Sequence, residues 1–302
     1  MFKRYEKNPV LKPLKDHAWE SKRVFNCAAV YEKGKVHIVY RAQGEDGISR
    51  LGYASSFDGY RIDERLDLPI FSPATHFETF GCEDPRVTKI ENDYYMCYTA
   101  YSKFRRWSRV NSKMRLAQAG LTSISVNNFF GQEWSWKKRV YPFPLTDSKN
   151  MVLFPRKFNG KYVVYHRIPP HIWIAYSDNL EDWSQSHHKI VMQPRETWEN
   201  VKIGAGAPPI KTEKGWLFVY HGIDEHFTYR LGLALIDPDD PETVRRSRKP
   251  IFEPKEKYEQ NIVFSCGAVV MDGKLFIYYG AADRVIGVAT ADVSELLSLF
   301  ET

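Results

Sequence analysis

The sequence predicts an all-β protein, a five-bladed β-propeller with a central axial pocket. A two-strand unit occurs five times, as an apolar strand, a polar turn and a strand rich in aromatic and β-branched residues. The second strands begin about 55 to 70 residues apart, a near-period typical of propeller blades. Each unit also ends in a polar or small residue, where strands of neighbouring blades would meet a common axis. The units are residues 25–42, 81–100, 150–167, 203–222 and 264–281.

Further strands are expected to complete each blade. A third strand follows each unit, and two units continue into a short outer strand within 61–71 and 243–252. Apolar residues at helical spacing near the C-terminus predict a short helix within 291–302. No segment reads as a linker, so we expect a single catalytic domain over residues 1–302. The third strands are expected within 50–59, 115–123, 172–183, 229–241 and 285–297.

The composition argues against nucleic-acid-binding, zinc-finger and membrane proteins. Lys and Arg exceed Asp and Glu by 43 to 37, but these cations are scattered and form no nucleic-acid signature. The four cysteines, Cys27, Cys82, Cys97 and Cys266, show no metal-finger spacing and are expected to be reduced core residues. With no apolar run of membrane-spanning length and no export signal, the sequence predicts a cytoplasmic protein without nucleic-acid or membrane partners.

The spacing between the second and third units is the longest. The surplus lies within Lys103–Lys149, a stretch rich in cations and tryptophans. These side chains are expected either to cover the pocket or to meet a neighbouring subunit of a homo-oligomer. The alternative is a solvated loop anchored by one tryptophan.

Two adjacent acids, Glu83 and Asp84, begin the inner strand of the second unit. Carboxylates are costly to bury without a partner or a function. Because neighbouring strand residues point to opposite faces, we expect only one of them to face the axis. The other is expected to pair with Arg86 or with a neighbouring blade. A plain Asp-Pro turn that caps the strand is the structural alternative.

Cations and amides stand at equivalent places in the next two units. Lys149 and Asn150 open the third unit and Arg167 closes it, while Lys202 opens the fourth unit and His221 closes it. Converging on one axis, these side chains would form an anion site, in which Arg supplies a planar fork and Lys a compact charge.

The opposite side of the predicted ring has a different chemistry. Asn26 opens and Arg41 closes the first unit, and Asp283 follows the fifth. An amide, a guanidinium and a carboxylate suit the hydroxyls of a sugar. The predicted ring therefore has an acidic proton donor, one half suited to the hydroxyls of a sugar (the sugar half) and one half suited to an anion (the anion half).

These motifs together resemble the β-mannoside phosphorylases of glycoside hydrolase family 130. The resemblance covers nearly the whole chain and implies a five-bladed propeller. It rests on GCEDPRV (81–87), KNMVLFPRKFNGKYVVYHR (149–167), KIGAGAPPI (202–210), FVYHG (218–222), CGAVV (266–270) and YYGAAD (278–283).

The resemblance also implies roles for individual residues. Asp84 corresponds to the catalytic acid, and its proton is implied to travel through the mannose 3-hydroxyl. One departure stands out, since the first phosphate position is commonly Arg in the family and is Lys149 here, which keeps the charge but loses the bidentate fork. The implied phosphate-binding residues are Lys149, Asn150, Arg167, Lys202 and His221, and the implied mannose-binding residues are Asn26, Arg41 and Asp283.

The implied reaction is inverting phosphorolysis of a β-mannoside to α-mannose 1-phosphate and a shortened acceptor. Inorganic phosphate is the co-substrate, and no other cofactor and no metal are expected. A phosphorylase can dispense with the second carboxylate that inverting hydrolysis needs, because phosphate is already an anionic nucleophile. Two alternatives stay open. One is a β-mannoside hydrolase, with Asp224 or Glu225 as its base, and the other is a non-catalytic sugar-binding propeller.

Overall fold

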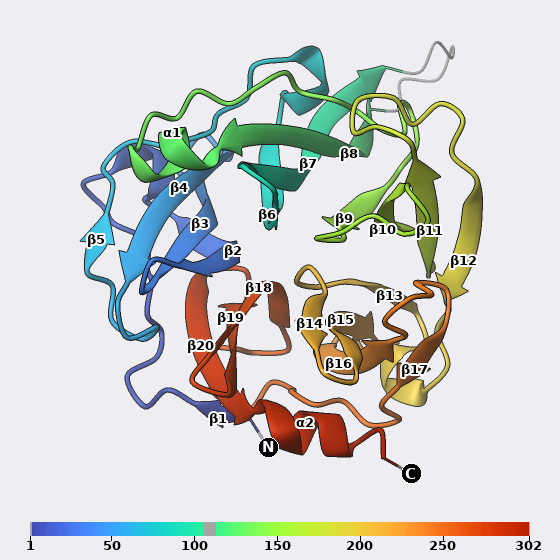
Figure 1. Cartoon of the computed structure of the whole chain (residues 1–302). Coiled ribbons are helices and arrows are strands. Elements are labelled where there is room, and N and C mark those ends of the chain that lie inside the picture. Colours follow the sequence, from blue (N-terminus) through green and yellow to red (C-terminus); the bar gives the residue numbers. More distant parts are fainter. Residues whose placement is uncertain (1, 106–112, 302) are drawn as a thin grey trace.

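The computed structural model describes residues 2–105 and 113–301, and most of its regular structure is β-strand. The predicted all-β class is confirmed. Figure 1 shows the strands grouped around a common centre, with β2, β6, β9 and β18 pointing towards it. The innermost strands touch in succession around this centre, because β18 contacts β2, β2 contacts β6, β6 contacts β9, and β9 contacts β13.

The first two units share one seven-stranded sheet. Its two halves are joined by a parallel pairing at Ser49 and Gly81, where β4 meets β6. The five predicted units therefore lie in four hydrogen-bonded sheets. The strands of the first sheet are β2 (Arg23–Glu32), β3 (Lys35–Gln43), β4 (Ser49–Ser56), β5 (Glu64–Arg65), β6 (Gly81–Ile90), β7 (Asp93–Arg105) and β8 (Lys113–Ser125).

Each remaining unit has a sheet of its own. The sheet of the third unit contains β9 (Lys149–Leu153), β10 (Tyr162–Ile168), β11 (His171–Ser177) and β12 (His188–Met192). The fourth contains β13 (Lys202–Ala205), β14 (Ile210–Thr212), β15 (Gly215–Ile223), β16 (Tyr229–Ile236) and β17 (Val244–Arg246). The fifth contains β18 (Val263–Met271), β19 (Lys274–Ala281) and β20 (Val285–Asp292), with β1 (Lys3–Arg4) paired to β20.

Most of these strands were predicted, and so was the closing helix α2 (Val293–Ser298). The short strands β1, β12 and β14 were missed, as was helix α1 (Val126–Phe130). Three 3-10 helices were also missed, η1 (Ala18–Glu20), η2 (His76–Glu78) and η3 (Thr197–Glu199). No helix within the described residues is long and apolar enough to cross a membrane.

Aromatic and aliphatic side chains fill the space between neighbouring sheets. The sheets of the third and fourth units share one buried cluster that includes Phe154, Tyr165 and Phe218, with Tyr165 and Phe218 packed edge to face at 5.4 Å. Such burial of apolar surface is the main driving force for folding. The four cysteines are buried free thiols, as predicted.

A buried Glu–Tyr–Arg cluster recurs in four of the five units. In the first, the Tyr40 hydroxyl donates to Glu20 Oε2 over 2.9 Å, and Arg65 binds the same carboxylate. The glutamate precedes the inner strand, the tyrosine lies on the second strand, and the arginine comes from the outer edge of the same unit. Because each carboxylate is paired with an arginine, its burial is compensated. The other clusters are Glu78, Tyr98 and Arg139; Glu199, Tyr220 and Arg246; and Glu259, Tyr279 and Arg4. In the fourth unit Arg246 binds Glu199, but the buried Tyr220 hydroxyl has no hydrogen-bond partner among the described residues.

The long stretch after Lys103 contributes mainly to packing where it is described. The Trp136 indole donates to the Ile70 carbonyl over 2.9 Å, and both Trp134 and Trp136 pack against the core of the first sheet. These two tryptophans therefore anchor the stretch to the first sheet. Residues 106–112 of this stretch, with Arg106 and Trp107, lie outside the described residues.

Candidate active site at the centre of the ring

Three predicted site residues lie at equivalent irregularities of the inner strands. Asn26, Asp84 and Asn150 have φ angles of 47°, 52° and 54°, the left-handed region that residues other than glycine seldom adopt. At each one the strand pairing shifts register, as at a β-bulge. A bulge re-aims a side chain that regular alternation would direct elsewhere. The bulges thus turn an amide, a carboxylate and a second amide towards the centre.

Asp84 is held by two side chains of the first unit. Its Oδ1 accepts hydrogen bonds from Asn26 Nδ2 and from Arg41 Nη1, each over 2.9 Å. Arg41 Nη2 also donates to Glu83 Oε1 over 2.5 Å, so both adjacent acids contact one guanidinium. The expectation that only one of them faces the axis is wrong, because the bulge at Asp84 breaks the alternation on which it relied.

Glu83 links this acidic cluster to the third unit. Lys149 Nζ donates to Glu83 Oε2 over 3.2 Å. Sequence reasoning expected one of the two acids to pair elsewhere but gave Glu83 no place in the site. Arg41 and Lys149 therefore share one buried carboxylate.

Arg86 binds backbone rather than the neighbouring acids. It is almost fully buried, and it donates to the carbonyls of Asp84, Gly206 and Ala205 over 2.7, 2.8 and 3.0 Å. Of the two pairings expected for the second acid, the one with Arg86 is therefore wrong, and the one with a neighbouring unit is confirmed by the contacts of Glu83 with Arg41 and Lys149. Arg86 itself ties the acidic bulge to the inner strand of the fourth unit.

The predicted anion half comes together between the third and fourth units. Arg167 Nη1 lies 3.4 Å from His221 Nε2, and both side chains are buried. Gly204 allows this close approach, because a Cβ there would stand 2.5 Å from His221 Cε1 and 2.8 Å from Asn150 Oδ1. Among the described residues, Arg167 Nε and Asn150 Oδ1 are buried without a hydrogen-bond partner.

The pKa values in this half indicate uncompensated positive charge. Burial, followed by the charges of Arg167 and Lys149, lowers the pKa of Lys202. Burial and the charge of Arg167 lower the pKa of His221 well below its usual value, so the imidazole is neutral at pH 7. The carboxylate of Asp147, which sequence reasoning missed, partly offsets this field at an exposed position. Such a cluster favours a bound anion.

Phosphate is therefore expected to stabilise the folded protein. An anion that binds only the native state at 100 times its Kd adds about 2.7 kcal/mol to the free energy of unfolding. Calorimetric melting with increasing phosphate should raise Tm, whereas equal ionic strength of sodium chloride should not. A Tm that responds equally to both salts would contradict an anion site.

Two carboxyls of the site have pKa values shifted in opposite directions. Burial raises the pKa of Asp84, but the charges of Arg41, Lys149 and Arg86 and the hydrogen bond from Asn26 outweigh burial and lower it. Burial and the nearby Asp84 charge raise the pKa of Asp283. In the ligand-free site Asp84 is thus ionised, and Asp283 retains its proton to a higher pH than an ordinary aspartate.

All nine residues predicted for the site lie in this connected group. Tyr229 also belongs to it, because its ring stacks on His221 at 6.2 Å and its pKa responds to Arg167, Asp283 and Asp84. The sequence shows Tyr229 only as the start of a strand, a weak signal. We call the whole group the central site: Asn26, Arg41, Glu83, Asp84, Lys149, Asn150, Arg167, Lys202, His221, Tyr229 and Asp283.

The two acids expected for a hydrolase lie in a turn after β15. Asp224 accepts hydrogen bonds from the amides of His226 and Thr228 and from Arg230 Nη1, the last over 2.6 Å. Glu225 is exposed. Asp224 thus stabilises its own turn, and neither acid is placed as a free base.

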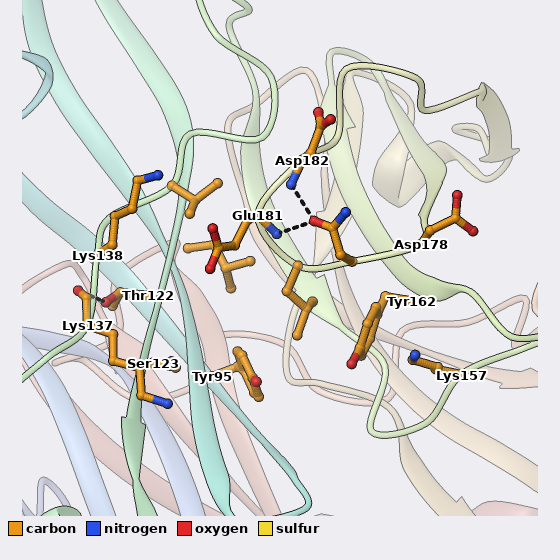
Figure 2. Close-up of a pocket in the computed structure, with 14 residues that line it drawn as sticks. Tyr95, Thr122, Ser123, Lys137, Lys138, Lys157, Tyr162, Asp178, Glu181 and Asp182 are labelled. Atoms are coloured by element: carbon orange, nitrogen blue, oxygen red, sulfur yellow. Dashed lines mark hydrogen bonds between the residues drawn. The ribbon is translucent and has the colours of Figure 1, made fainter.

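Two clefts of about 600 Å³ lie outside the central site. One is shown in Figure 2, where Lys138 on one wall faces Glu181 on the other and Tyr95 and Tyr162 lie below them. None of the central-site residues lines it. The other cleft is lined by Arg23, Gln43 and Arg284, the last next to Asp283 in the chain. Burial and the charge of Asp84 raise the pKa of Asp283, and the charge of Arg23 opposes part of this rise.

Comparison with known proteins places this geometry in context. Residues 2–302 match the model of the Glyco_hydro_130 family, described as β-1,4-mannooligosaccharide phosphorylase. The chain is 42% identical to a 1,2-β-oligomannan phosphorylase of Thermoanaerobacter sp. (strain X514), over 98% of each chain. It also resembles the structure of a β-1,2-mannobiose phosphorylase from Listeria innocua with β-1,2-mannobiose (TM-score 0.81, 27% identity, 99% of each chain). A further similar structure (TM-score 0.82, 27% identity, 97% and 94% coverage) is described with glycoside hydrolases of this family that target β-1,2-mannosidic linkages in Candida mannan.

Proposed function

Because the chain belongs to glycoside hydrolase family 130, we propose that it is an inverting β-mannoside phosphorylase. It transfers a β-linked mannosyl unit to inorganic phosphate, which yields α-mannose 1-phosphate and a shortened acceptor. The observation that carries the proposal is the group of cations and amides around Arg167, which faces the central site without a matching set of carboxylates. Such a group suits an anionic nucleophile.

We assign the roles as follows. A phosphate oxygen attacks C1 of mannose while the C1–oxygen bond to the acceptor breaks, and the leaving oxygen receives a proton that originates on Asp84. Asn26, Arg41 and Asp283 hold the mannose hydroxyls, and the mannose 3-hydroxyl relays the proton. The phosphate lies among Lys149, Asn150, Arg167, Lys202 and His221. No metal or organic cofactor takes part.

The low pKa of Asp84 constrains this mechanism. A general acid must carry a proton, yet Arg41 and Asn26 stabilise its anion in the free site. Mannose hydroxyls that compete for these two donors would remove part of that stabilisation and raise the pKa of Asp84. Substrate binding would thereby create the acid that the reaction needs.

The cleft beside Asp283 is our candidate for the acceptor. In an inverting displacement, the nucleophile and the leaving group lie on opposite faces of the sugar. The phosphate residues come from the third and fourth units, whereas this cleft is lined by Arg23, Gln43 and Arg284 of the first and fifth. We favour a β-1,2-linked substrate, because the 42% identical relative is named for 1,2-β-oligomannan.

The decisive experiment compares β-mannosides with and without phosphate. In phosphate-free buffer the protein should release little mannose, and added phosphate should produce α-mannose 1-phosphate. In reverse, α-mannose 1-phosphate with β-1,2-mannobiose as acceptor should release phosphate. Rapid mannose release that ignores phosphate would instead establish a hydrolase.

Hydrolysis has a precedent in the family, but the central site does not favour it. An inverting hydrolase needs a carboxylate base to activate water. Asp224 is bound within its turn, and Glu83 is paired with both Arg41 and Lys149. A non-catalytic sugar-binding protein would have no use for the cations opposite the sugar half.

The same proposal extends to architecture and location. We propose that residues 1–302 form one five-bladed β-propeller, with the first two blades merged at the Ser49–Gly81 pairing. The succession of contacts among the inner strands supports it. We also propose a cytoplasmic location, which four buried unpaired thiols support.

A further inference from the structure

The third unit lacks the buried Glu–Tyr–Arg cluster of the other four. His166 stands on β10 where Tyr40 stands on β3, since each directly precedes the arginine that reaches the central site, Arg167 or Arg41. Both ring nitrogens of His166 have partners. Nδ1 lies 2.9 Å from Ser148 Oγ, and Nε2 lies 3.0 Å from His188 Nδ1.

Each of the three residues lies in a segment equivalent to that of its counterpart in the first unit. Ser148 precedes the inner strand as Glu20 does, and His188 lies on the outermost strand β12 as Arg65 lies on β5. Ser148 and His166 are fully buried, and Phe143 packs on the His166 ring at 4.3 Å. The cluster is therefore a built hydrogen-bonded core element rather than a gap left by a lost glutamate.

This replacement leaves the third unit's part of the anion half without a buried Glu–Arg pair, whereas the fourth unit keeps Glu199 and Arg246. Burial, followed by the charge of His188, lowers the pKa of His166 to about 3, so the ring is neutral under ordinary conditions. In the other four units a buried glutamate is paired with an arginine. The cluster of the third unit contains neither a carboxylate nor a guanidinium.

The third unit is also the one that supplies most of the phosphate residues. Lys149 directly follows Ser148, Arg167 directly follows His166, and the two cations are cross-strand partners. Arg41, at the equivalent place in the first unit, is bound by two carboxylates. Among the described residues, Arg167 has no carboxylate within ion-pair distance. A buried negative charge beneath it would oppose an incoming phosphate.

We propose that Ser148, His166 and His188 are positioning residues whose neutrality keeps the cations of the third unit available for phosphate. They support β9 and β10 as the Glu–Tyr–Arg clusters support the other units, but they add no carboxylate to the unit that carries Lys149 and Arg167. The inference rests on the proposed function, because it takes phosphate to be the ligand of this half.

A pair of variants that differ only in charge tests the proposal. Ser148→Asp and Ser148→Asn have nearly equal volume, so packing changes are matched. We expect the KM for phosphate to be about tenfold or more higher in Ser148→Asp than in Ser148→Asn, with the KM for the mannoside nearly equal in both. Adding His188→Arg to Ser148→Asp should recover part of the loss, because the arginine would neutralise the new carboxylate.

A second pair guards against a folding failure at the buried position. His188 lies at the exposed edge of the cluster, so His188→Glu and His188→Gln place or omit a charge with less disturbance. The same separation in phosphate KM is expected, though smaller. Equal phosphate KM values within both pairs would overturn the proposal and leave the cluster a purely structural role.

These experiments distinguish a failure of this inference from a failure of the proposed function. If wild-type protein shows no phosphate-dependent turnover, the function fails, but the phosphate-induced rise in Tm can still be compared within each pair. If turnover requires phosphate and the charged and neutral variants behave alike, only the inference fails.

Discussion

Replacing Asp84 by Asn is expected to lower kcat by about 10²–10⁴-fold, the usual contribution of a general acid. The amide has the same shape, and its oxygen can still accept hydrogen bonds from Asn26 and Arg41, which hold the carboxylate at 2.9 Å. What it loses is the ability to gain and donate a proton. Steady-state phosphorolysis of β-1,2-mannobiose measures the loss, and calorimetric titration should show that mannoside binding persists.

Asp224→Asn is the matched control for this variant. Asp224 is also held by an arginine, at 2.6 Å, but it stabilises a turn. Its replacement should leave kcat near the wild-type value. Near-normal turnover of Asp84→Asn would remove Asp84 from the mechanism, and a large loss in Asp224→Asn would revive it as a catalytic base.

Replacing Arg167 by Ala, or Lys202 by Ala, is expected to raise the KM for phosphate far more than the KM for the mannoside. Each change removes a charge-assisted contact worth about 1.5–3 kcal/mol, or roughly 10- to 150-fold in affinity. Arg167 lacks a carboxylate partner among the described residues, so its loss should weaken phosphate with little disturbance of the acidic cluster. Initial rates over a grid of both substrates separate the two constants.

Arg156→Ala provides the control for charge alone. Arg156 is partly exposed and pairs with Asp239 at 3.0 Å, away from the central site. Its removal changes the net charge equally and should leave both KM values unchanged. Equal weakening of phosphate and mannoside in Arg167→Ala would show that the arginine does not belong to a phosphate site.

The recurring strands were predictable because their pattern is periodic. Alternating apolar and aromatic runs with polar turns recur five times, and the polar residues at their ends identified nine members of the central site. The short strand β12 was missed because HKIVM is half polar and largely exposed. Its pairing with β11 depends on neighbouring structure rather than on its own sequence.

The side-chain directions at Glu83 and Asp84 were not predictable from alternation. The bulge at Asp84 requires a left-handed backbone, which a sequence signals clearly only when glycine stands there. The Glu–Tyr–Arg clusters did have a signal, an aromatic residue directly before each glutamate, as in Trp19–Glu20 and Tyr258–Glu259. Recognising it would have required knowledge of which distant tyrosine and arginine complete the cluster.

The pairing of β1 with β20 has a consequence for biosynthesis. Lys3 and Arg4 pair with Thr290 and Ala289, and Arg4 also completes the cluster around Glu259. Lys3 and Arg4 are translated nearly 290 residues before these partners, so β1 stays unpaired until β20 has been translated. The last sheet therefore cannot be completed before residues 289 and 290 have been translated. A bulky fusion placed directly before residue 3 is expected to lower the yield of folded protein more than the same fusion placed after residue 301.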